Sequence, residues 1–277
     1  MPLKLMYITN QPEVAQVVEH AGVDRVFVDM EYIGKSARQG GMDTVQSHHT
    51  VEDVAAVRAV LKKSELLVRI NPVHAAEDGH MGTAVEVERV IAAGADVLML
   101  PYFKTVEEVQ TFLQCVNGRA KTMLLVETKE AVEHLDEILG LPGIDEVHIG
   151  MNDLSISYGK KFMFELLSDG TVERLCDRIR RAGITAYGFG GIASLGKGLL
   201  PAEMIICEHY RLGSSIAILS RSFCNVNQID DLEELKRVFE TGVADIRGFE
   251  RRCTTCCDLA ENRQKLAEKV TEIVSTL

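Results

Sequence analysis

The sequence predicts a (β/α)8 barrel, or TIM barrel, followed by a C-terminal helical extension. Eight short, continuous apolar runs recur along the chain, segments with helical spacing separate them, and 277 residues suit one large barrel. Runs without polar alternation are typical of strands that are buried on both faces of a parallel sheet. A doubly wound open sheet is the alternative. It normally has a glycine-rich turn after its first strand, where this chain has TNQPE.

The elements follow in alternation along the chain. The predicted strands are residues 5–8, 25–29, 66–70, 97–100, 122–126, 146–149, 185–189 and 208–212. The clearest helical patterns between them cover residues 51–61, 105–116 and 131–139. The turns AGVDRV, AGADVL, PGIDEV and AGITAY each end a helix with glycine and start the next strand.

The amphipathic pattern of residues 230–277 exceeds what a barrel needs. We therefore divide the chain into a barrel, residues 1–223, and a helical extension, residues 224–277. The extension is expected to pack on the barrel or on a neighbouring subunit.

Composition limits the classes of partner. Hydrophobic residues make up 46% and charged residues 26% of the chain, which is ordinary for a globular protein. The net charge of −11, without a block of basic residues, argues against nucleic acid and anionic lipid as partners. No run approaches the ~18 apolar residues of a membrane span, and no signal-peptide core is present, so a cytoplasmic protein is expected.

The number of cysteines also fits the expected cytoplasmic location. Seven cysteines, an odd number, suit a reducing environment better than a disulfide framework. Cys253, Cys256 and Cys257 form the motif CTTCC, which could bind zinc. The motif lacks a second ligand pair at suitable spacing, and its flanks have a helical pattern. Thiols carried on helices are therefore the favoured interpretation.

Two acidic residues follow consecutive strands of the predicted barrel. Glu127 and Asp153 lie 26 residues apart, about one βα unit, so neighbouring strands would present them side by side at the catalytic end. Two adjacent carboxylates repel each other unless a cation lies between them. Oxygen ligands completed by water and substrate suit Mg²⁺ or Mn²⁺ better than Zn²⁺. The alternative is that one or both carboxylates cap a helix or form a salt bridge.

Three segments add a family resemblance. VRINP, AAGADVLMLPYFKTVEEV and VETKEAVEHLDEILGLPGIDEVHIGMNDLSISYG together resemble the HpcH/HpaI aldolase and citrate lyase β-subunit family, over about residues 5 to 222. The resemblance implies that Glu127 and Asp153 hold a divalent metal ion. It also implies that Arg69 contacts the carboxylate or enolate oxygen of a pyruvate-like group. The predicted substrate-binding positions beside the metal are Gly150, Met151, Asn152 and Ser155, and Ser155 is expected to begin the following helix.

The chain departs from the family pattern at two positions. Tyr32 replaces the histidine that the aldolases have after the acidic residue of the second-strand motif, and Leu125 replaces a glutamine. An ordinary tyrosine, with a pKa near ~10, is a poor base at neutral pH. Asp29 and Glu31 are further catalytic candidates, or else they pair with Lys35 or Arg38. Histidines that could supply a substitute base are His48, His49, His74 and His80.

Two loops offer further contacts. The polar loop of residues 33–49 could act as a lid or a subunit contact, and its Lys35, Arg38 and Gln39 could meet an acidic substrate tail. GFGGIA and RLGSS, which are expected to follow the seventh and eighth strands, could bind phosphate with help from Arg211.

Three functions remain open at this point. The favoured one is a metal-dependent carbon–carbon lyase, an aldolase that cleaves or forms a 2-oxo acid aldol through a pyruvate-type enolate. The alternatives are a citrate lyase-like acyl-thioester lyase or citrate-forming enzyme, and a catalytically silent barrel that binds a metabolite. The resemblance also implies a homo-oligomer, because relatives associate through their C-terminal helices.

Overall fold

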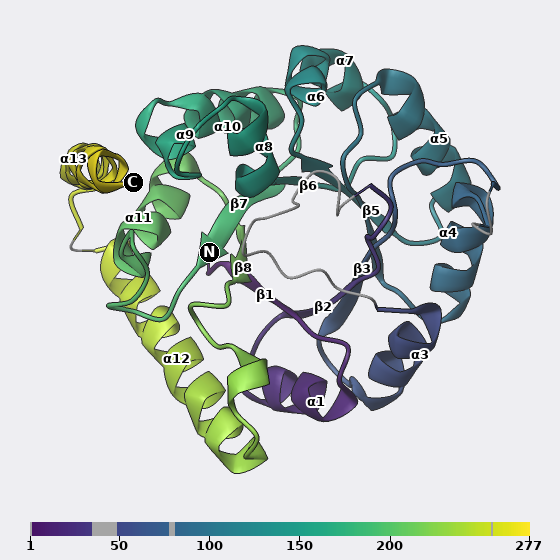
Figure 1. The fold of residues 1–277 in the computed structure, drawn as a ribbon, viewed down its shortest axis with the longest axis horizontal. Helices are drawn as coiled ribbons and strands as arrows, with labels where there is room; N and C mark the ends of the chain where they lie inside the picture. Colours follow the sequence, from purple (N-terminus) through teal and green to yellow (C-terminus); the bar gives the residue numbers. More distant parts are fainter. Residues whose placement is uncertain (1, 35–48, 78–80, 256) are drawn as a thin grey trace.

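The computed structural model describes residues 2–34, 49–77, 81–255 and 257–277. Eight parallel strands form a closed barrel in chain order, and the helices lie outside the strands (Figure 1). The strands are β1 (Lys4–Ile8), β2 (Arg25–Asp29), β3 (Glu65–Arg69), β4 (Val97–Leu100), β5 (Lys121–Val126), β6 (Glu146–Ile149), β7 (Ala186–Ile192) and β8 (Ile216–Leu219). The predicted barrel is therefore confirmed, and the open sheet is wrong.

Several helices begin where a side chain accepts a hydrogen bond from one of the first backbone N–H groups. Thr50 and Thr105 each form a capping box with the acidic residue three positions later. The helices between strands are α1 (Pro12–His20), α3 (Val51–Val60), α4 (Thr83–Ala92), α5 (Val106–Val116), α6 (Lys129–Glu133), α7 (Leu135–Leu139), α8 (Met151–Ser157), α9 (Glu165–Ser168), α10 (Thr171–Arg181) and α11 (Ala202–Leu212). The helix predicted over residues 131–139 is thus two short helices, separated at His134.

The eighth predicted strand, residues 208–212, is wrong. These residues form the last turns of α11, which ends where Gly213 adopts a left-handed conformation with φ of 70°. The helix packs against β7 on one side and against the C-terminal helices on the other, so most of its residues are buried. A helix buried on several faces loses the polar stripe that distinguishes it from a buried strand in the sequence.

Side chains alternate between the barrel interior and the outer core. One apolar cluster fills the interior, and it consists of Met6, Phe27, Leu67, Val97, Met99, Met123, Leu125 and Ile216. A larger cluster packs the outer face of the strands against the helices. Residues two apart therefore share a face, and the interior face of β5 and β6 continues into the loops that follow them.

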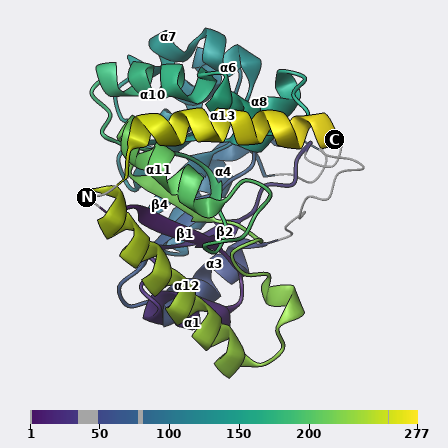
Figure 2. The same ribbon diagram turned by 90° about the vertical axis from the view of Figure 1, so that its left-hand side faces the viewer.

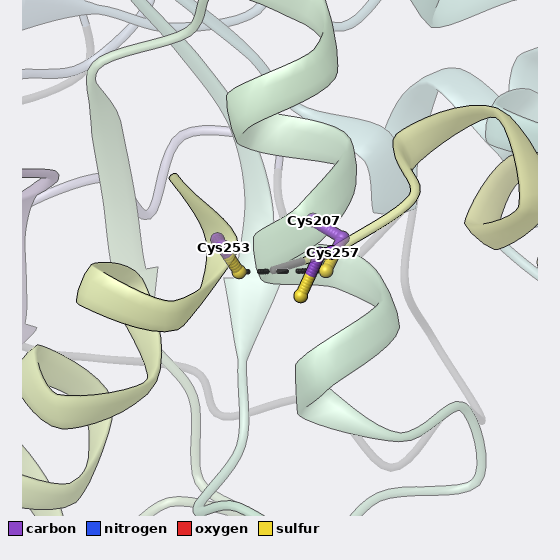
Figure 3. Close-up of side chains that lie close together, drawn as sticks. All are labelled: Cys207, Cys253 and Cys257. Atoms are coloured by element: carbon purple, nitrogen blue, oxygen red, sulfur yellow. Dashed lines mark hydrogen bonds between the residues drawn. The ribbon is translucent and has the colours of Figure 1, made fainter. Parts of the chain in front are cut away.

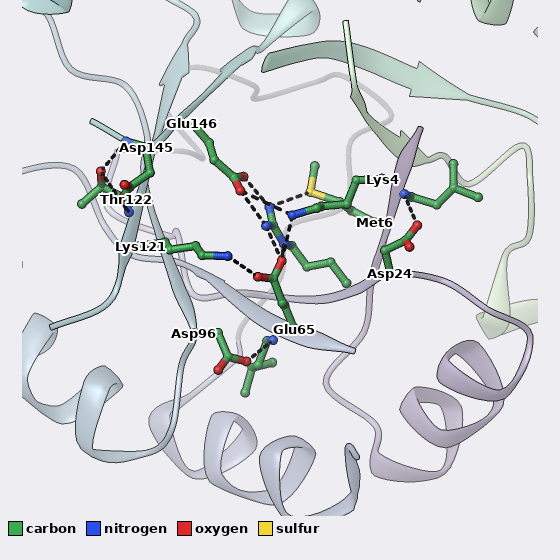
Figure 4. Close-up of polar contacts among 12 residues, drawn as sticks. Lys4, Met6, Asp24, Glu65, Asp96, Lys121, Thr122, Asp145 and Glu146 are labelled. Carbon is green, nitrogen blue, oxygen red and sulfur yellow. Dashed lines mark hydrogen bonds and ion pairs between the residues drawn. The ribbon is translucent and has the colours of Figure 1, made fainter. Parts of the chain in front are cut away.

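A buried ionic network closes the interior at the amino ends of the strands (Figure 4). The fully buried Arg25 donates to both carboxylate oxygens of Glu146, at 2.7 and 2.9 Å, and to Oε2 of Glu65 at 2.6 Å. Lys4 and Lys121 also donate to Glu65. Burial alone would raise the pKa of Glu65, but the hydrogen bonds from Lys121 and Arg25 outweigh it and hold that pKa at about 2.

The C-terminal extension packs on the barrel. After a 3-10 turn, η1 (Val226–Gln228), α12 (Leu232–Cys253) contacts α1 and α11. The last helix, α13 (Leu259–Thr276), lies along α11 and contacts α9 (Figure 2). Glu250 of α12 accepts hydrogen bonds from the Leu3 amide, at 2.6 Å, and from the Tyr210 hydroxyl, at 3.0 Å. Among the residues described, no helix is long and apolar enough to cross a membrane.

Candidate active site

A cavity of about 460 Å³ opens at the carboxyl ends of the strands. Barrel enzymes carry their chemistry at this end. The predicted site residues that line it are Asp29, Arg69, Glu127, Gly150, Met151, Asn152 and Asp153. Three other predicted residues, Glu31, Tyr32 and Ser155, do not line it.

Glu127 directly follows β5 and is buried. Its Oε1 accepts a hydrogen bond of 2.9 Å from the backbone amide of Tyr102, a residue with a φ of 47°. A Cβ atom at position 150 would lie 2.7 Å from Oε2 of Glu127, so only glycine leaves room for this carboxylate. Burial raises the pKa of Glu127 to about 8, and the charges of Glu31 and Asp153 add to the shift while Arg69 opposes it.

Asp153 lies in the first turn of α8, which follows β6, and it is half-buried. It lines the same cavity as Glu127, and its charge is one cause of the raised pKa of Glu127. Carboxylates crowded in this way bind protons or cations to relieve their repulsion. The oxygen donors of Glu127 and Asp153 fit a hard divalent cation such as Mg²⁺ or Mn²⁺.

Arg69 is the last residue of β3 and is held by two carboxylates. Its Nε donates to Oδ1 of Asp29 at 2.8 Å, and its Nη2 donates to Oδ2 at 2.7 Å. The Oε2 atom of Glu31 lies 3.4 Å from Nε. Burial would lower the pKa of Arg69, but the charges of Asp29 and Glu31 outweigh it, so the guanidinium stays charged. Asp29 and Glu31 therefore orient Arg69. Lys35 and Arg38, the partners predicted for them from the sequence, lie outside the described residues.

Tyr32 and Ser155 lie outside the cavity lining. The Tyr32 side chain is exposed, and its backbone amide donates to Oδ1 of Asn71 at 3.0 Å. Burial, and then the charge of Glu86, raise the pKa of Tyr32, so even less of the phenolate that could act as a base is present at neutral pH. The Ser155 hydroxyl donates to the carbonyl of Asn152. The prediction that Ser155 begins the helix is wrong, because α8 already begins at Met151.

One of the predicted histidines reaches the cavity. His49 lines it, and its Nδ1 accepts a hydrogen bond of 3.0 Å from the Asp29 amide. That contact puts the proton of the neutral ring on Nε2. The ring of His74 instead contacts the carbonyl of Pro72, outside the cavity lining. His48 and His80 lie outside the described residues, as do Lys35, Arg38 and Gln39.

The sequence reasoning missed His148. It lies in β6, is buried and lines the cavity. Neither ring nitrogen makes a well-formed hydrogen bond within the described part of the chain, although the nearby Gly190 backbone favours the protonated form. Burial dominates and lowers the pKa of His148 to about 4. The alternation of side chains along a strand could have revealed it, because residues 146, 148 and 150 share the interior face.

This burial predicts a pH dependence of stability. His148 is neutral when folded, whereas an unfolded histidine with a pKa near ~6.5 binds a proton. Its contribution to the free energy of unfolding is therefore full above pH ~6.5 and is lost as the pH falls toward about 4. Urea unfolding between pH 7 and 4 should show a smaller loss in His148→Gln than in the wild type. The matched control is His20→Gln, at an exposed position. If the free energy of unfolding of His148→Gln falls with pH as steeply as that of the wild type, the prediction is contradicted.

The expected role of Arg211 is wrong. Because residues 208–212 are helical, Arg211 lies on α11 and forms ion pairs with Glu173 and Glu208, both at 2.8 Å. RLGSS therefore precedes β8, at the end opposite to the cavity. The arginine that follows β8 and lines the cavity is Arg221. From GFGGIA, Gly190 and Gly191 do line it.

Comparison with known proteins identifies the family of the chain. The model of the HpcH/HpaI aldolase/citrate lyase family matches residues 4–189. A hydroxypyruvate/pyruvate aldolase from Sagittula stellata is 27% identical over 27% of this chain and 42% of its own length. A 2-keto-3-deoxy-L-rhamnonate aldolase from Escherichia coli is 26% identical over 65% of this chain and 71% of its own length. The chain thus spans less than half of the first relative and somewhat over two thirds of the second.

The fold has a counterpart among solved structures. The crystal structure of an HpcH/HpaI aldolase/citrate lyase family protein from Burkholderia cenocepacia superposes with a TM-score of 0.62 at 19% sequence identity. The match covers 85% of this chain and 95% of that protein, and at this identity it shows the fold alone. The family model, in contrast, matches the sequence itself over most of the chain and includes Arg69, Glu127 and Asp153. This chain therefore belongs to the HpcH/HpaI aldolase/citrate lyase family.

Proposed function

We propose that this protein is a divalent-metal-dependent lyase that cleaves or forms a 2-oxo acid aldol, with the enolate of pyruvate or a close analogue as intermediate. The observation that carries the proposal is the buried Glu127 carboxylate, which shares one cavity with Asp153 and Arg69. The two carboxylates can bind a cation, and the neighbouring guanidinium can bind an anionic substrate that also contacts this cation. The aldolases named above support a pyruvate-type substrate.

Glu127 and Asp153 would hold the cation, and Mg²⁺ or Mn²⁺ suits their oxygen donors. When bound, such a cation acts as a Lewis acid toward the 2-oxo group. The Tyr102 amide fixes one oxygen of Glu127, and Gly150 leaves space for the other. This support holds the carboxylate in one orientation, as a ligand requires.

Arg69 would donate to the carboxylate or the enolate oxygen of the substrate. Asp29 occupies Nε and Nη2 of the guanidinium, so the substrate would meet the Nη1 side. A fixed cation stabilises negative charge better than a mobile one, because it does not need to reorganise as charge develops. Asp29 and Glu31 would therefore contribute to catalysis through Arg69.

Proton transfer needs a group other than Tyr32, which lies outside the cavity lining. We propose His49 for this role. Its Nδ1 is fixed by the Asp29 amide, and the ring lines the cavity, so Nε2 would give or take the proton.

The proposal includes a small-molecule 2-oxo acid as partner. A homo-oligomer and a cytoplasmic location stay predictions of the sequence. The citrate lyase-like alternative would require an acyl thioester, and dependence on coenzyme A is what separates it from an aldolase.

The test uses the chelator-treated, full-length protein with a panel of 4-hydroxy-2-oxo acids. Release of pyruvate, coupled to lactate dehydrogenase, should depend on added Mg²⁺ or Mn²⁺. Oxalate, which resembles the pyruvate enolate, should inhibit competitively. A folded, metal-loaded protein that releases pyruvate from no member of the panel contradicts the proposal. Activity that appears only with coenzyme A thioesters would favour the alternative.

A further inference from the structure

Three cysteines from separate segments converge outside the barrel (Figure 3). None of them lines the cavity. Cys207 lies on α11, Cys253 is the last residue of α12, and Cys257 lies in the connection to α13. Their sulfur atoms all lie within 4.8 Å of one another, and those of Cys207 and Cys253 are 3.4 Å apart. Cys207 is the member that the sequence motif CTTCC could not reveal.

We propose that Cys207, Cys253 and Cys257 form a three-sulfur site for a soft divalent cation, with Zn²⁺ as the expected ion. Zinc–sulfur bonds are about 2.3 Å long, so tetrahedral geometry separates two sulfur ligands by about 3.8 Å. The Cys207–Cys253 separation of 3.4 Å is close to that value, and all three separations lie within 4.8 Å, so small side-chain rotations would bring the sulfurs to tetrahedral spacing. Thiolate ligands favour soft cations over Mg²⁺ and Ca²⁺.

Burial favours such a site. Cys207 and Cys253 are buried, whereas Cys257 is half-buried. Water can therefore reach one side of the cluster and supply a fourth ligand. The sulfur set differs in chemistry from the oxygen set of Glu127 and Asp153, so the two sites would select different ions.

A disulfide explains the convergence of the three cysteines less well than a metal ion does. A disulfide between Cys207 and Cys253 would need only two sulfurs, and no disulfide is present among the cysteines that the structure describes. The third sulfur at the same point has no role in that bond. A metal ion uses all three.

The site would fasten the C-terminal extension to the barrel. A cation bound there joins α11 to the end of α12 and to Cys257, which directly precedes Asp258, the N-cap residue of α13. Beyond the cap, Asn262 of α13 donates to the Met204 carbonyl and to Oε1 of Glu208, both on α11 and both at 3.1 Å. Arg263 of α13 also pairs with Glu173 of α10 at 3.1 Å. The bound ion should add to these contacts and stabilise the packing of α13 on α11.

Cobalt provides the test, because sulfur-to-cobalt charge transfer gives near-ultraviolet absorption that a carboxylate site cannot give. The reduced, full-length Glu127→Gln variant is titrated with Co²⁺, so that the cavity site does not compete. We expect the absorption to saturate at one Co²⁺ per chain and to disappear on addition of Zn²⁺. Zn²⁺ should also slow hydrogen exchange at the start of α13.

Cysteine variants locate the signal. Cys207→Ser and Cys257→Ser should lose the charge-transfer band, whereas Cys115→Ser, on α5, should keep it. Cys257 is half-buried, so its variant tests the proposal even where Cys207→Ser fails to fold. Absence of the band in the reduced parent, or a full band in Cys257→Ser, overturns the proposal. Alkylation and mass spectrometry can detect a disulfide between Cys207 and Cys253. If that disulfide is found and the protein still does not bind Co²⁺ after reduction, the proposal is overturned.

Discussion

Glu127→Gln is expected to lower kcat/KM for pyruvate release by about 10³-fold or more while the barrel stays folded. The amide has the shape of the carboxylate, and its oxygen can still accept from the Tyr102 amide. What it lacks is the negative charge that would hold the cation. Steady-state kinetics at saturating Mn²⁺ measure the loss of kcat/KM, and circular dichroism shows whether the barrel stays folded. Glu137→Gln, an exposed change on the neighbouring α7, is the matched control.

The same substitution should stabilise the metal-free protein. The pKa of Glu127 is raised to about 8 when folded, whereas an unfolded glutamate has a pKa near ~4.3. Between these values the folded state holds a proton that the unfolded state has lost, so this residue makes the free energy of unfolding fall as pH rises. Glu127→Gln should remove that fall and raise the Tm of the metal-free protein at pH 8. Retained activity would contradict a role of Glu127 in holding the cation, and an unchanged Tm would contradict the predicted stabilisation.

Arg25→Met is expected to have the largest effect on stability, about 3–5 kcal/mol in the free energy of unfolding. Arg25 is fully buried, and its removal leaves the buried Glu146 carboxylate with only the longer contact to Lys4, at 3.6 Å, to balance its charge. Glu65 keeps Lys4 and Lys121 as partners, so most of the cost arises at Glu146. Urea unfolding at pH 7 measures it.

The control for Arg25 is Lys121→Met. Lys121 also pairs with Glu65, but half of its side chain is exposed, so the expected loss is below about 1 kcal/mol. The deficit of Arg25→Met should shrink as the pH falls, because Glu146 can then be protonated and no longer carries a buried charge. Equal losses in the two variants would mean that burial does not set the strength of these ion pairs.

The fold was largely predictable, because continuous apolar runs and glycine-ended helices repeat with the period of a barrel. The prediction failed where burial removed the pattern. Residues 208–212 are covered on both sides, so a helix had the sequence appearance of a strand. That single shift also placed Arg211 at the cavity, whereas Arg221 is the arginine that lines it.

The site was predictable where strand ends alone determine position. Arg69 is the last residue of β3, Glu127 directly follows β5, and Asp153 lies in the first turn of the helix after β6. All three line one cavity. Tyr32 lies a few residues into a loop, where sequence does not determine which way a side chain points. His148 lies within a strand, and its place on the interior face depends on the register of β6, which a motif search does not use.

The ionic network around Arg25 has a topological effect beyond stability. Together with the apolar layer above it, the network fills the barrel below the cavity. A substrate that reacts beside Glu127 would then arrive and depart through the cavity at the carboxyl ends of the strands. Two products of one cleavage would then share a single exit, and the fragment nearer the opening would have to leave before the deeper one.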